Sequence, residues 1–266
     1  MANDDINVLL DHLKEAVANQ WDGVVLVDGI EGSGKTNLAF NSAYYVDKSF
    51  CLDRVVFTPE QFFKAVDEAK PGQAIVWDEF INGGMSTDFL AKAQKSLIKK
   101  MVMIRKKNLY FFWVVPYFFM LGRYFSVARS RFLLHAYTPD GIRRGFWQSW
   151  NYERKKVMYF RGRKEFDYCE KAFSSGTFKE FFKEHPGIID KEAYELKKDE
   201  ASSGVNEDSE NVVVGVRYRT LDNYFCVLIE YLKSNKNMSV VDVSNITGCP
   251  VQTLYNKLAV KHEKVS

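Results

Sequence analysis

The stretch VDGIEGSGKTNLAF, residues 27–40, decides the fold of the N-terminal part of this chain. An apolar run, VVLV, leads into it, a helical pattern follows, and the skeleton Gly29-x-x-x-x-Gly34-Lys35-Thr36 stands between them. Glycines free successive backbone N–H groups to wrap phosphates, and the start of a helix adds its positive end. The stretch predicts a strand, a phosphate-binding loop and a helix; a chance glycine turn before a helix is the alternative.

In such a loop Lys35 would neutralise the β- and γ-phosphates, and the Thr36 hydroxyl would hold Mg²⁺. The expected ligands are therefore ATP and Mg²⁺. We predict that the nucleotide is bound by Gly29, Ile30, Glu31, Gly32, Ser33, Gly34, Lys35, Thr36 and Asn37.

Two adjacent carboxylates end another apolar run, AIVWDEF, residues 74–80. Asp78 is placed to orient the water shell of Mg²⁺, so the predicted metal ligands are Thr36 and Asp78. Glu79 can align the attacking water and accept its proton, which makes Glu79 and Lys35 the predicted catalytic pair. The alternative is two solvated acids at the end of a strand.

Strand and helix patterns alternate around these motifs. Such alternation predicts an α/β fold with a mostly parallel sheet between helix layers. The expected helices are 5–19, a helix through Ala43, 59–69 with Thr58 as its cap, 87–106 and a short one at 120–128; the expected strands are 23–28, 54–57, 74–80, 109–115 and 131–137. Next, GFWQSWNY (145–152) and KVMYFR (156–161) are predicted as antiparallel additions, before a helix near 169–184.

Composition restricts the class of protein. The 266 residues allow one α/β domain plus a small appendage, and four cysteines without a CxxC pair favour reduced thiols over a disulfide framework or a zinc site. The acidic amphipathic start is unlike a signal peptide, and the apolar run 111–121 is too short to span a bilayer, which needs about 20 residues. A cytoplasmic protein without a membrane span is predicted, in the host cytoplasm if the protein is viral.

Charge is distributed unevenly along the chain. Residues 95–164 contain 17 Lys and Arg against two acidic residues, Asp140 and Glu153. This asymmetry predicts a polyanionic partner, DNA ahead of acidic lipid. The charge reverses around KKDEASSGVNEDSEN, and the predicted organisation is an ATPase domain at 1–187, an acidic flexible linker at 188–216 and a small domain at 217–266.

The C-terminal part has the pattern of a helix-turn-helix. SVVDVSNITGCPVQTLYNKLAV, residues 239–260, contains two short helical patterns separated by Thr247-Gly248-Cys249-Pro250. Its second helix would present side chains able to contact bases and phosphates, although such units also serve as protein-interaction modules. The predicted DNA-contacting residues are Gln252, Thr253, Tyr255, Asn256 and Lys257.

Together these motifs resemble the RecA-like P-loop ATPases that have an added strand and a catalytic glutamate. Residues 22–137, which contain the Walker A loop, PGQAIVWDEF and MIRKKNLYFFWVVPYFFMLGRYFSVARSRFLLHAY, are similar to ATPases of viruses and mobile elements, relatives of FtsK/HerA translocases and Zot-like proteins. The resemblance implies a motor on DNA and a homo-oligomer, commonly a hexameric or other ring.

One position departs from this family. Relatives place a polar sensor after the strand that follows Walker B, where this chain has Val115 and Pro116. A sensor or arginine finger must then come from elsewhere, although each arginine also fits a solvated or DNA-facing role. The candidates are Arg105, Asn108, Arg123, Arg129 and Arg131.

Three functions fit the sequence. The first is an ATP-hydrolysing DNA motor or remodeller, of the translocation, packaging or replication type, recruited by the helix-turn-helix. The second is an ATP-switched DNA-binding regulator, in which hydrolysis only resets the state. The third, a small-molecule or nucleoside kinase, would need a lid and an acceptor pocket that the sequence does not indicate.

Overall fold

A computed structural model describes residues 4–80, 99 and 101–208 of the chain. The chain divides into two compact units, Met1–Ala201 and Ser202–Ser266. The predicted helix-turn-helix, with Gln252, Thr253, Tyr255, Asn256 and Lys257, lies outside the described residues, as does most of the predicted helix 87–106.

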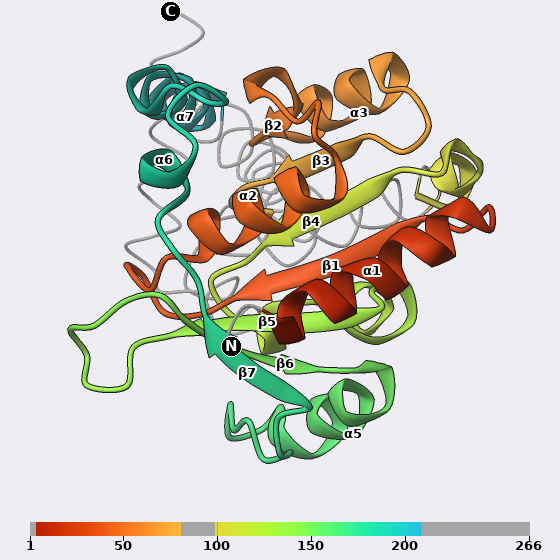
Figure 1. The fold of residues 1–266 in the computed structure, drawn as a ribbon, viewed down its shortest axis with the longest axis vertical. Helices are drawn as coiled ribbons and strands as arrows, with labels where there is room; N and C mark the ends of the chain where they lie inside the picture. Colours follow the sequence, from red (N-terminus) through yellow and green to blue (C-terminus); the bar gives the residue numbers. More distant parts are fainter. Residues whose placement is uncertain (1–3, 81–98, 100, 209–266) are drawn as a thin grey trace, which may run out of the picture. The chain divides into compact units, whose positions relative to one another are not determined.

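The first unit is an α/β fold built on one seven-stranded sheet, in the order β2-β3-β4-β1-β5-β6-β7 (Figure 1). The five strands β2, β3, β4, β1 and β5 are parallel. Strand β6 pairs antiparallel with β5, and β7 pairs antiparallel with β6. The strands are β1 Gly23–Asp28, β2 Val55–Val56, β3 Ala74–Trp77, β4 Tyr110–Val114, β5 Phe132–Tyr137, β6 Phe146–Trp150 and β7 Ser174–Thr177. The predicted mostly parallel sheet and the antiparallel strand at 145–152 are confirmed.

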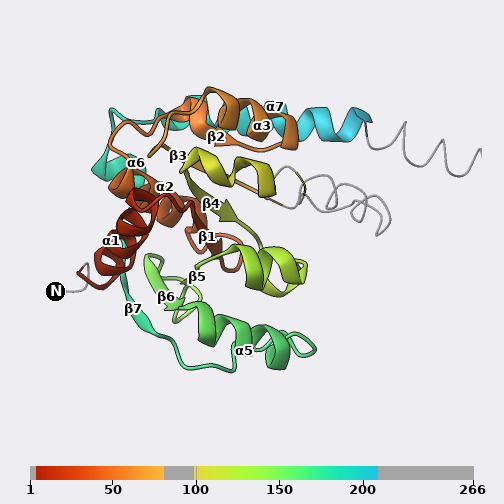
Figure 2. The same cartoon turned by 90° about the vertical axis from the view of Figure 1, so that its right-hand side faces the viewer.

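Helices cover both faces of the sheet (Figure 2). The α-helices are α1 Asp4–Ala18, α2 Lys35–Val46, α3 Pro59–Glu68, α5 Tyr152–Gly162, α6 Phe181–Glu184 and α7 Lys191–Asp208. Shorter helical turns are η1 Leu52–Arg54, η2 Arg105–Lys107, η3 Phe118–Met120 and the π-helix η4 Tyr124–Arg129, and residues 101–104 are also helical. At the start of α3, Thr58 accepts a hydrogen bond from the Gln61 N–H at 3.3 Å, which confirms the predicted cap.

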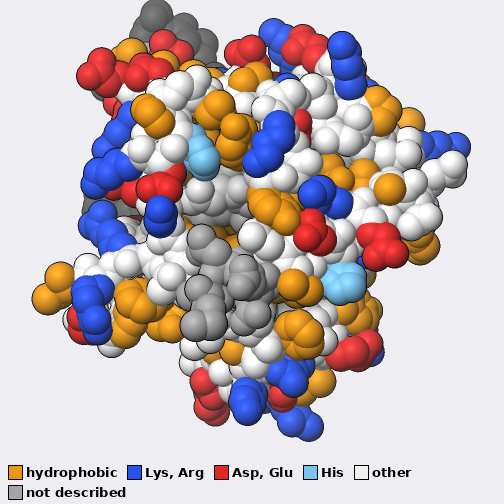
Figure 3. Space-filling view, in the orientation of Figure 1, with side chains coloured by type: hydrophobic (Ala, Val, Ile, Leu, Met, Phe, Trp, Pro, Cys, Tyr) orange, Lys and Arg blue, Asp and Glu red, His pale blue; other side chains and the backbone are white. Residues whose placement is uncertain are grey.

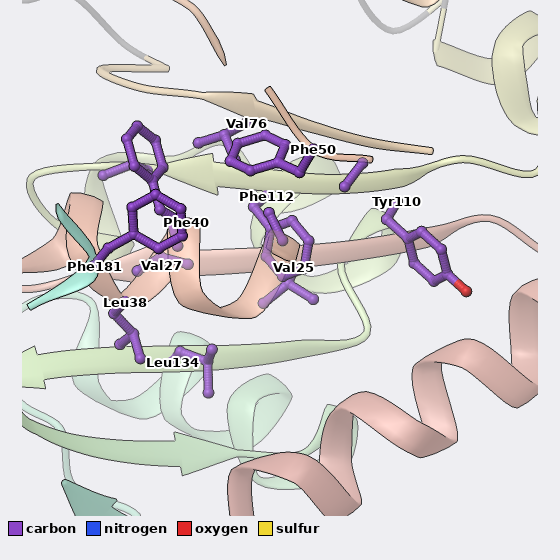
Figure 4. Packing of buried hydrophobic residues seen from close by; sticks show 14 of the residues in the cluster. Val25, Val27, Leu38, Phe40, Phe50, Val76, Tyr110, Phe112, Leu134 and Phe181 are labelled. Carbon is purple, nitrogen blue, oxygen red and sulfur yellow. The ribbon is translucent and has the colours of Figure 1, made fainter. Parts of the chain in front are cut away.

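Successive strand residues point to opposite faces of the sheet, so two cores form. One core contains Val25 and Val27 of β1 with residues of α1, α2, α6 and α7. In this core the rings of Phe40 and Phe181 pack edge to face, 5.4 Å apart, beside Val27 (Figure 4). The other core contains Val24 and Leu26 with residues of α3, η3, η4 and α5. Burial on both faces explains why β1 and β4 read as continuous apolar runs.

Three predictions on the C-terminal half of this unit are wrong. KVMYFR is part of α5 rather than a strand, because Asn151 caps that helix by accepting the Arg154 N–H at 3.1 Å. A helix is predicted near residues 169–184. The structure instead has strand β7 there, which pairs with β6, followed by the short helix α6.

The third wrong prediction concerns the linker. The sequence predicts a flexible linker at residues 188–216, but α7 begins at Lys191, and Tyr194 and Ala201 are buried in the first core. Residues 209–216 of the predicted linker lie outside the described residues. The compact unit accordingly extends to Ala201 rather than ending at residue 187.

Candidate functional site

The phosphate-loop sequence and the acid pair meet at one edge of the sheet. Leu26 of β1 and Trp77 of β3 both align with Trp113 of the intervening strand β4. Because the strands are parallel, the segments that follow them leave the sheet at the same edge. The loop after β1 and the Asp78–Glu79 pair after β3 therefore lie close together, as the sequence predicts.

Two glycines are required by the conformation of the loop. Gly29 has a φ of 142°, and a Cβ there would stand 2.1 Å from the carbonyl oxygen of Ala136 in the neighbouring strand. Gly34 has a φ of 98° and is the N-cap of α2. Residues with a side chain rarely adopt such positive φ values, so the glycines let the loop turn directly into the helix.

A cavity of about 820 Å³ opens at this edge. Six of the nine residues predicted to bind nucleotide line it, namely Glu31, Gly32, Gly34, Lys35, Thr36 and Asn37. Of the other three, Gly29 and Ser33 are buried, and the side chain of Ile30 is exposed. The Oγ of Ser33 is buried without a hydrogen-bond partner among the described residues.

Lys35 and Thr36, the first residues of α2, have different partners. The Lys35 ammonium donates a hydrogen bond to the carbonyl oxygen of Ile30 at 2.9 Å, so it lies against the loop. Burial lowers the pKa of Lys35, and the negative charge of Asp78 acts against that shift. The Thr36 hydroxyl donates to Oδ2 of Asp78 at 3.0 Å, so the two predicted metal ligands are in direct contact.

Asn37 has mainly a structural role. Its Oδ1 accepts the backbone N–H of Phe181 at 2.8 Å and so attaches the start of α6 to α2. Asn37 also lines the cavity, but its side-chain oxygen is already engaged. The prediction that Asn37 binds nucleotide has no support from this contact.

The acid pair differs in burial. The side chain of Asp78 is buried, which raises its pKa, while hydrogen bonds from Tyr194 and Thr36 act in the opposite direction. Glu79 has a left-handed backbone, with a φ of 55°, and its side chain is 40% exposed. Its carboxylate thus reaches the cavity, whose lining includes both acids.

Several cavity residues are not indicated by the sequence motifs, and three of them, Arg144, Tyr194 and Lys198, have polar side chains that matter for the site. Arg144, from the loop between β5 and β6, lines the cavity, and its guanidinium lies 3.6 Å from where a Cβ on Gly32 would stand. Tyr194 and Lys198 of α7 also line it. Their spacing of four residues was a usable signal, since residues four apart share a face of a helix, but the charged sequence around them suggested a linker.

Lys and Arg side chains gather near α6 and the loop after β5, two segments that border the cavity (Figure 3).

The end of β4 gives the cavity an apolar wall. Val114, Val115 and Pro116 line it there. Apolar side chains therefore stand at the position where the resemblance implies a polar sensor.

Four of the five predicted sensor or finger residues lie at the opposite edge of the sheet. Arg129 forms a two-hydrogen-bond ion pair with the buried Asp22, just before β1, and Arg131 donates to the Asp22 carbonyl at 3.2 Å. Arg105 stacks on Trp21, with 4.8 Å between guanidinium and ring. The carbonyl of Asn108, just before β4, accepts the Gly72 N–H at 2.8 Å. None of these four lines the cavity of their own chain.

The fifth candidate, Arg123, lies between η3 and η4. Its guanidinium is 4.9 Å from the ring of Phe160, and the residue is exposed. It does not line the cavity either.

The basic segment is partly used inside the protein. Lys155 is buried and donates to the carbonyl oxygens of Ser126, Val127 and Ser130 at 2.7–3.3 Å, near the end of the π-helix. Burial lowers the pKa of Lys155 to about 7. Lys155 and the paired Arg129 are therefore not available to a polyanion, whereas Arg105, Lys106, Lys156 and Lys164 are exposed.

Comparisons with known proteins leave the site to be judged on its geometry. No protein-family model matches this chain, and no curated protein or solved structure matches it either. None of the helices in the described ranges has the length and apolar character needed to cross a bilayer. Across the same ranges, no group of three or more His, Cys, Asp or Glu side chains is arranged to hold a metal ion.

Proposed function

We propose that this chain binds ATP in the cavity between the Gly29–Thr36 loop and the acid pair and hydrolyses it to drive or control a process on DNA. The observation that carries the proposal is the contact between Thr36 and Asp78, 3.0 Å apart at the mouth of a glycine loop that leads into a helix. This contact joins two residues that are 42 positions apart in the sequence. One stands at the end of the proposed phosphate-binding loop, and the other is a buried carboxylate.

Several residues have a role in this proposal. The loop N–H groups and the start of α2 would bind the phosphates, and the cations of Lys35 and Arg144 would neutralise them. Glu79, partly exposed at the cavity, would accept the proton of the attacking water.

Magnesium fits the residues present. It prefers oxygen ligands and is held by one or two protein groups together with substrate phosphates and waters. The Thr36 hydroxyl and the Asp78 carboxylate supply such oxygens, so the absence of a larger acidic cluster among the described residues is compatible with it. Bound Mg²⁺ would neutralise phosphate charge and orient the phosphate oxygens.

The strand order supports the resemblance to RecA-like P-loop ATPases. β4 lies between β1, which carries the loop, and β3, which carries the acids, and this is consistent with an added strand. The DNA-motor part of the proposal rests on the exposed cations of residues 95–164 and on the helix-turn-helix pattern of residues 217–266. A homo-oligomer follows from the resemblance.

Steady-state ATP hydrolysis by the full chain tests this part, measured at low salt with no DNA, double-stranded DNA or single-stranded DNA. A motor predicts strong stimulation by one form, and the stimulation should decrease steeply with salt because phosphate contacts release counterions. ATP and DNA binding without any stimulation would contradict the motor.

An ATP-switched DNA-binding regulator is the second candidate, and one contact favours it. Lys198 and Glu79 form an ion pair at 2.8 Å, which engages the proposed base. A protein whose base is engaged would turn over slowly and spend most of its time in the ATP-bound state. This candidate predicts slow hydrolysis that DNA does not change, and DNA affinity that a non-hydrolysable ATP analogue alters.

A further inference from the structure

Helix α7 contacts both members of the acid pair. The Tyr194 hydroxyl donates to Oδ2 of Asp78 at 2.6 Å, and the Lys198 ammonium pairs with Oε1 of Glu79 at 2.8 Å. Tyr194 and Lys198 are four residues apart, so they lie on one face of α7, directed at the acids. One helix face therefore engages two adjacent side chains that the proposed reaction needs.

Both contacts occupy oxygens that have another use in the proposed function, on which this inference rests. Oδ2 of Asp78 accepts hydrogen bonds from Thr36 and Tyr194 together. The Lys198 ammonium occupies Oε1 of Glu79, an oxygen of the carboxylate that would otherwise contact the attacking water. Both acids are therefore engaged by α7 in this structure.

The body of α7 is packed firmly against the protein, whereas its contact with Glu79, the proposed general base, is weak. The ring of Tyr194 packs against Phe40, Phe57 and Phe182. The Lys197 ammonium donates to the carbonyl oxygens of Leu52 and Val55 at 2.9 and 2.8 Å. The Lys198–Glu79 pair, in contrast, has side chains 31% and 40% exposed.

An ion pair so exposed to water is weak, because solvent screens the two charges. The contact is therefore easily broken and re-formed, as a regulatory contact must be. Burial alone would lower the pKa of Lys198, but the hydrogen bond to Glu79 and the charges of Asp78 and Glu79 raise it, so Lys198 stays charged at neutral pH.

We propose that α7 is an autoinhibitory helix, which restrains hydrolysis while Lys198 holds Glu79 and Tyr194 holds Asp78. Lys198 is a positioning residue in this scheme and acts through Glu79. Loosening α7 or removing the ammonium frees the base, so hydrolysis accelerates without any new contact to ATP.

The test compares Lys198→Met with wild type in the full chain. The variant keeps most of the side-chain stem and loses the ammonium, and with it both the charge and the hydrogen bond to Glu79. The expected result is a kcat about two- to fivefold higher, the range that corresponds to an ion pair of up to about 1 kcal/mol. KM for ATP should stay unchanged. Lys198→Arg, which keeps the positive charge, should hydrolyse ATP at the wild-type rate.

Leu196→Ala is the matched control on the same helix, since Leu196 is 64% exposed and does not line the cavity. Its kcat should equal that of wild type. A kcat for Lys198→Met equal to or below wild type would overturn the proposal, because Lys198 would then be neutral or supportive in hydrolysis.

Hydrogen exchange of the α7 amides gives a readout that does not depend on activity. Lys197→Met removes the bonds to Leu52 and Val55 without touching the acids, so it should increase exchange in α7 and raise kcat together. Faster exchange with an unchanged or lower kcat would overturn autoinhibition.

Binding of a fluorescent ATP analogue separates this inference from the proposed function. Binding by wild type and its loss in Lys35→Ala would support the nucleotide site, whatever the Lys198 variants do. If the wild-type protein neither binds the analogue nor hydrolyses ATP, the proposed function fails and the autoinhibitory role fails with it.

Discussion

The Thr36 hydroxyl donates a hydrogen bond to Oδ2 of Asp78 across 3.0 Å, linking the first turn of α2 to the end of β3. This bond brings together the two motifs from which the proposed function is built.

Lys35→Ala should weaken ATP binding about 10- to 100-fold, because a charge-assisted hydrogen bond contributes roughly 1.5–3 kcal/mol. Isothermal titration with a non-hydrolysable analogue measures the change. Lys70→Ala, at an exposed lysine in the turn before β3, should bind like wild type. Equal affinity in Lys35→Ala and wild type would contradict a phosphate role for the loop.

Arg144→Gln should lower kcat/KM for ATP about tenfold, since it removes a cation that lines the cavity near Gly32. The neighbouring Arg143 provides the matched control: it pairs with Asp140 at 2.6 Å and does not line the cavity. Arg143→Gln should therefore leave kcat/KM unchanged. If the two variants lose activity equally, the loop acts through its general charge and not through Arg144.

Arg129→Ala should lower the free energy of unfolding by about 3–5 kcal/mol, because it leaves the buried Asp22 carboxylate without its partner. Urea denaturation measures this loss. Arg123→Ala, at an exposed arginine over Phe160, should cost about 1 kcal/mol or less. A stable Arg129→Ala protein with impaired ATP hydrolysis would show instead that Arg129 acts as an arginine finger on a neighbouring subunit.

Lys155 predicts a pH dependence of stability. Its pKa is lowered by burial to about 7 in the folded protein, against 10.5 for an unperturbed lysine, so the unfolded chain binds more protons between these values. Stability from this group therefore rises with pH across the window, by up to about 1.4 kcal/mol per pH unit.

Lys155→Met removes that dependence along with the hydrogen bonds to Ser126, Val127 and Ser130. Unfolding free energies of the two proteins should diverge as pH increases from 7 to 9, with wild type gaining relative to the variant. A constant difference across this range would mean that Lys155 stays fully charged in the folded protein.

The parts of the fold set by local pattern could be predicted from the sequence. The glycine loop, the Thr58 cap and the apolar strands carry their own signals, because each depends on neighbouring residues. The order of the strands has no such local signal, because long-range packing places β4 between β1 and β3.

The wrong predictions concern segments whose composition favours a different structure from the one that the fold imposes. The Val, Met, Tyr and Phe of residues 156–161 favour a strand, but the Asn151 cap starts a helix there. Strand β7 reads SSGT, a polar edge strand without an apolar run to mark it. Helix α7 is rich in charge, but Tyr194 and Ala201 are buried in the first core and Lys197 donates to two backbone carbonyl oxygens.

The part of the site built by the loop and the acids was predictable, and the part built by Arg144, Tyr194 and Lys198 was not. The first group belongs to motifs with fixed spacing. The second comes from elements whose placement depends on the tertiary fold, more than 60 residues beyond the acid pair in every case.

The most direct measurement is phosphate release from ATP under single-turnover conditions by wild type and Glu79→Gln, with Glu68→Gln as an exposed control. Glu79→Gln keeps the shape of the side chain and removes its ability to accept a proton. We expect wild type and Glu68→Gln to release phosphate, and we expect Glu79→Gln to bind ATP normally but to release phosphate at least about 100-fold more slowly. Equal rates in all three proteins would contradict the assignment of Glu79 as the base of an ATP-hydrolysing site.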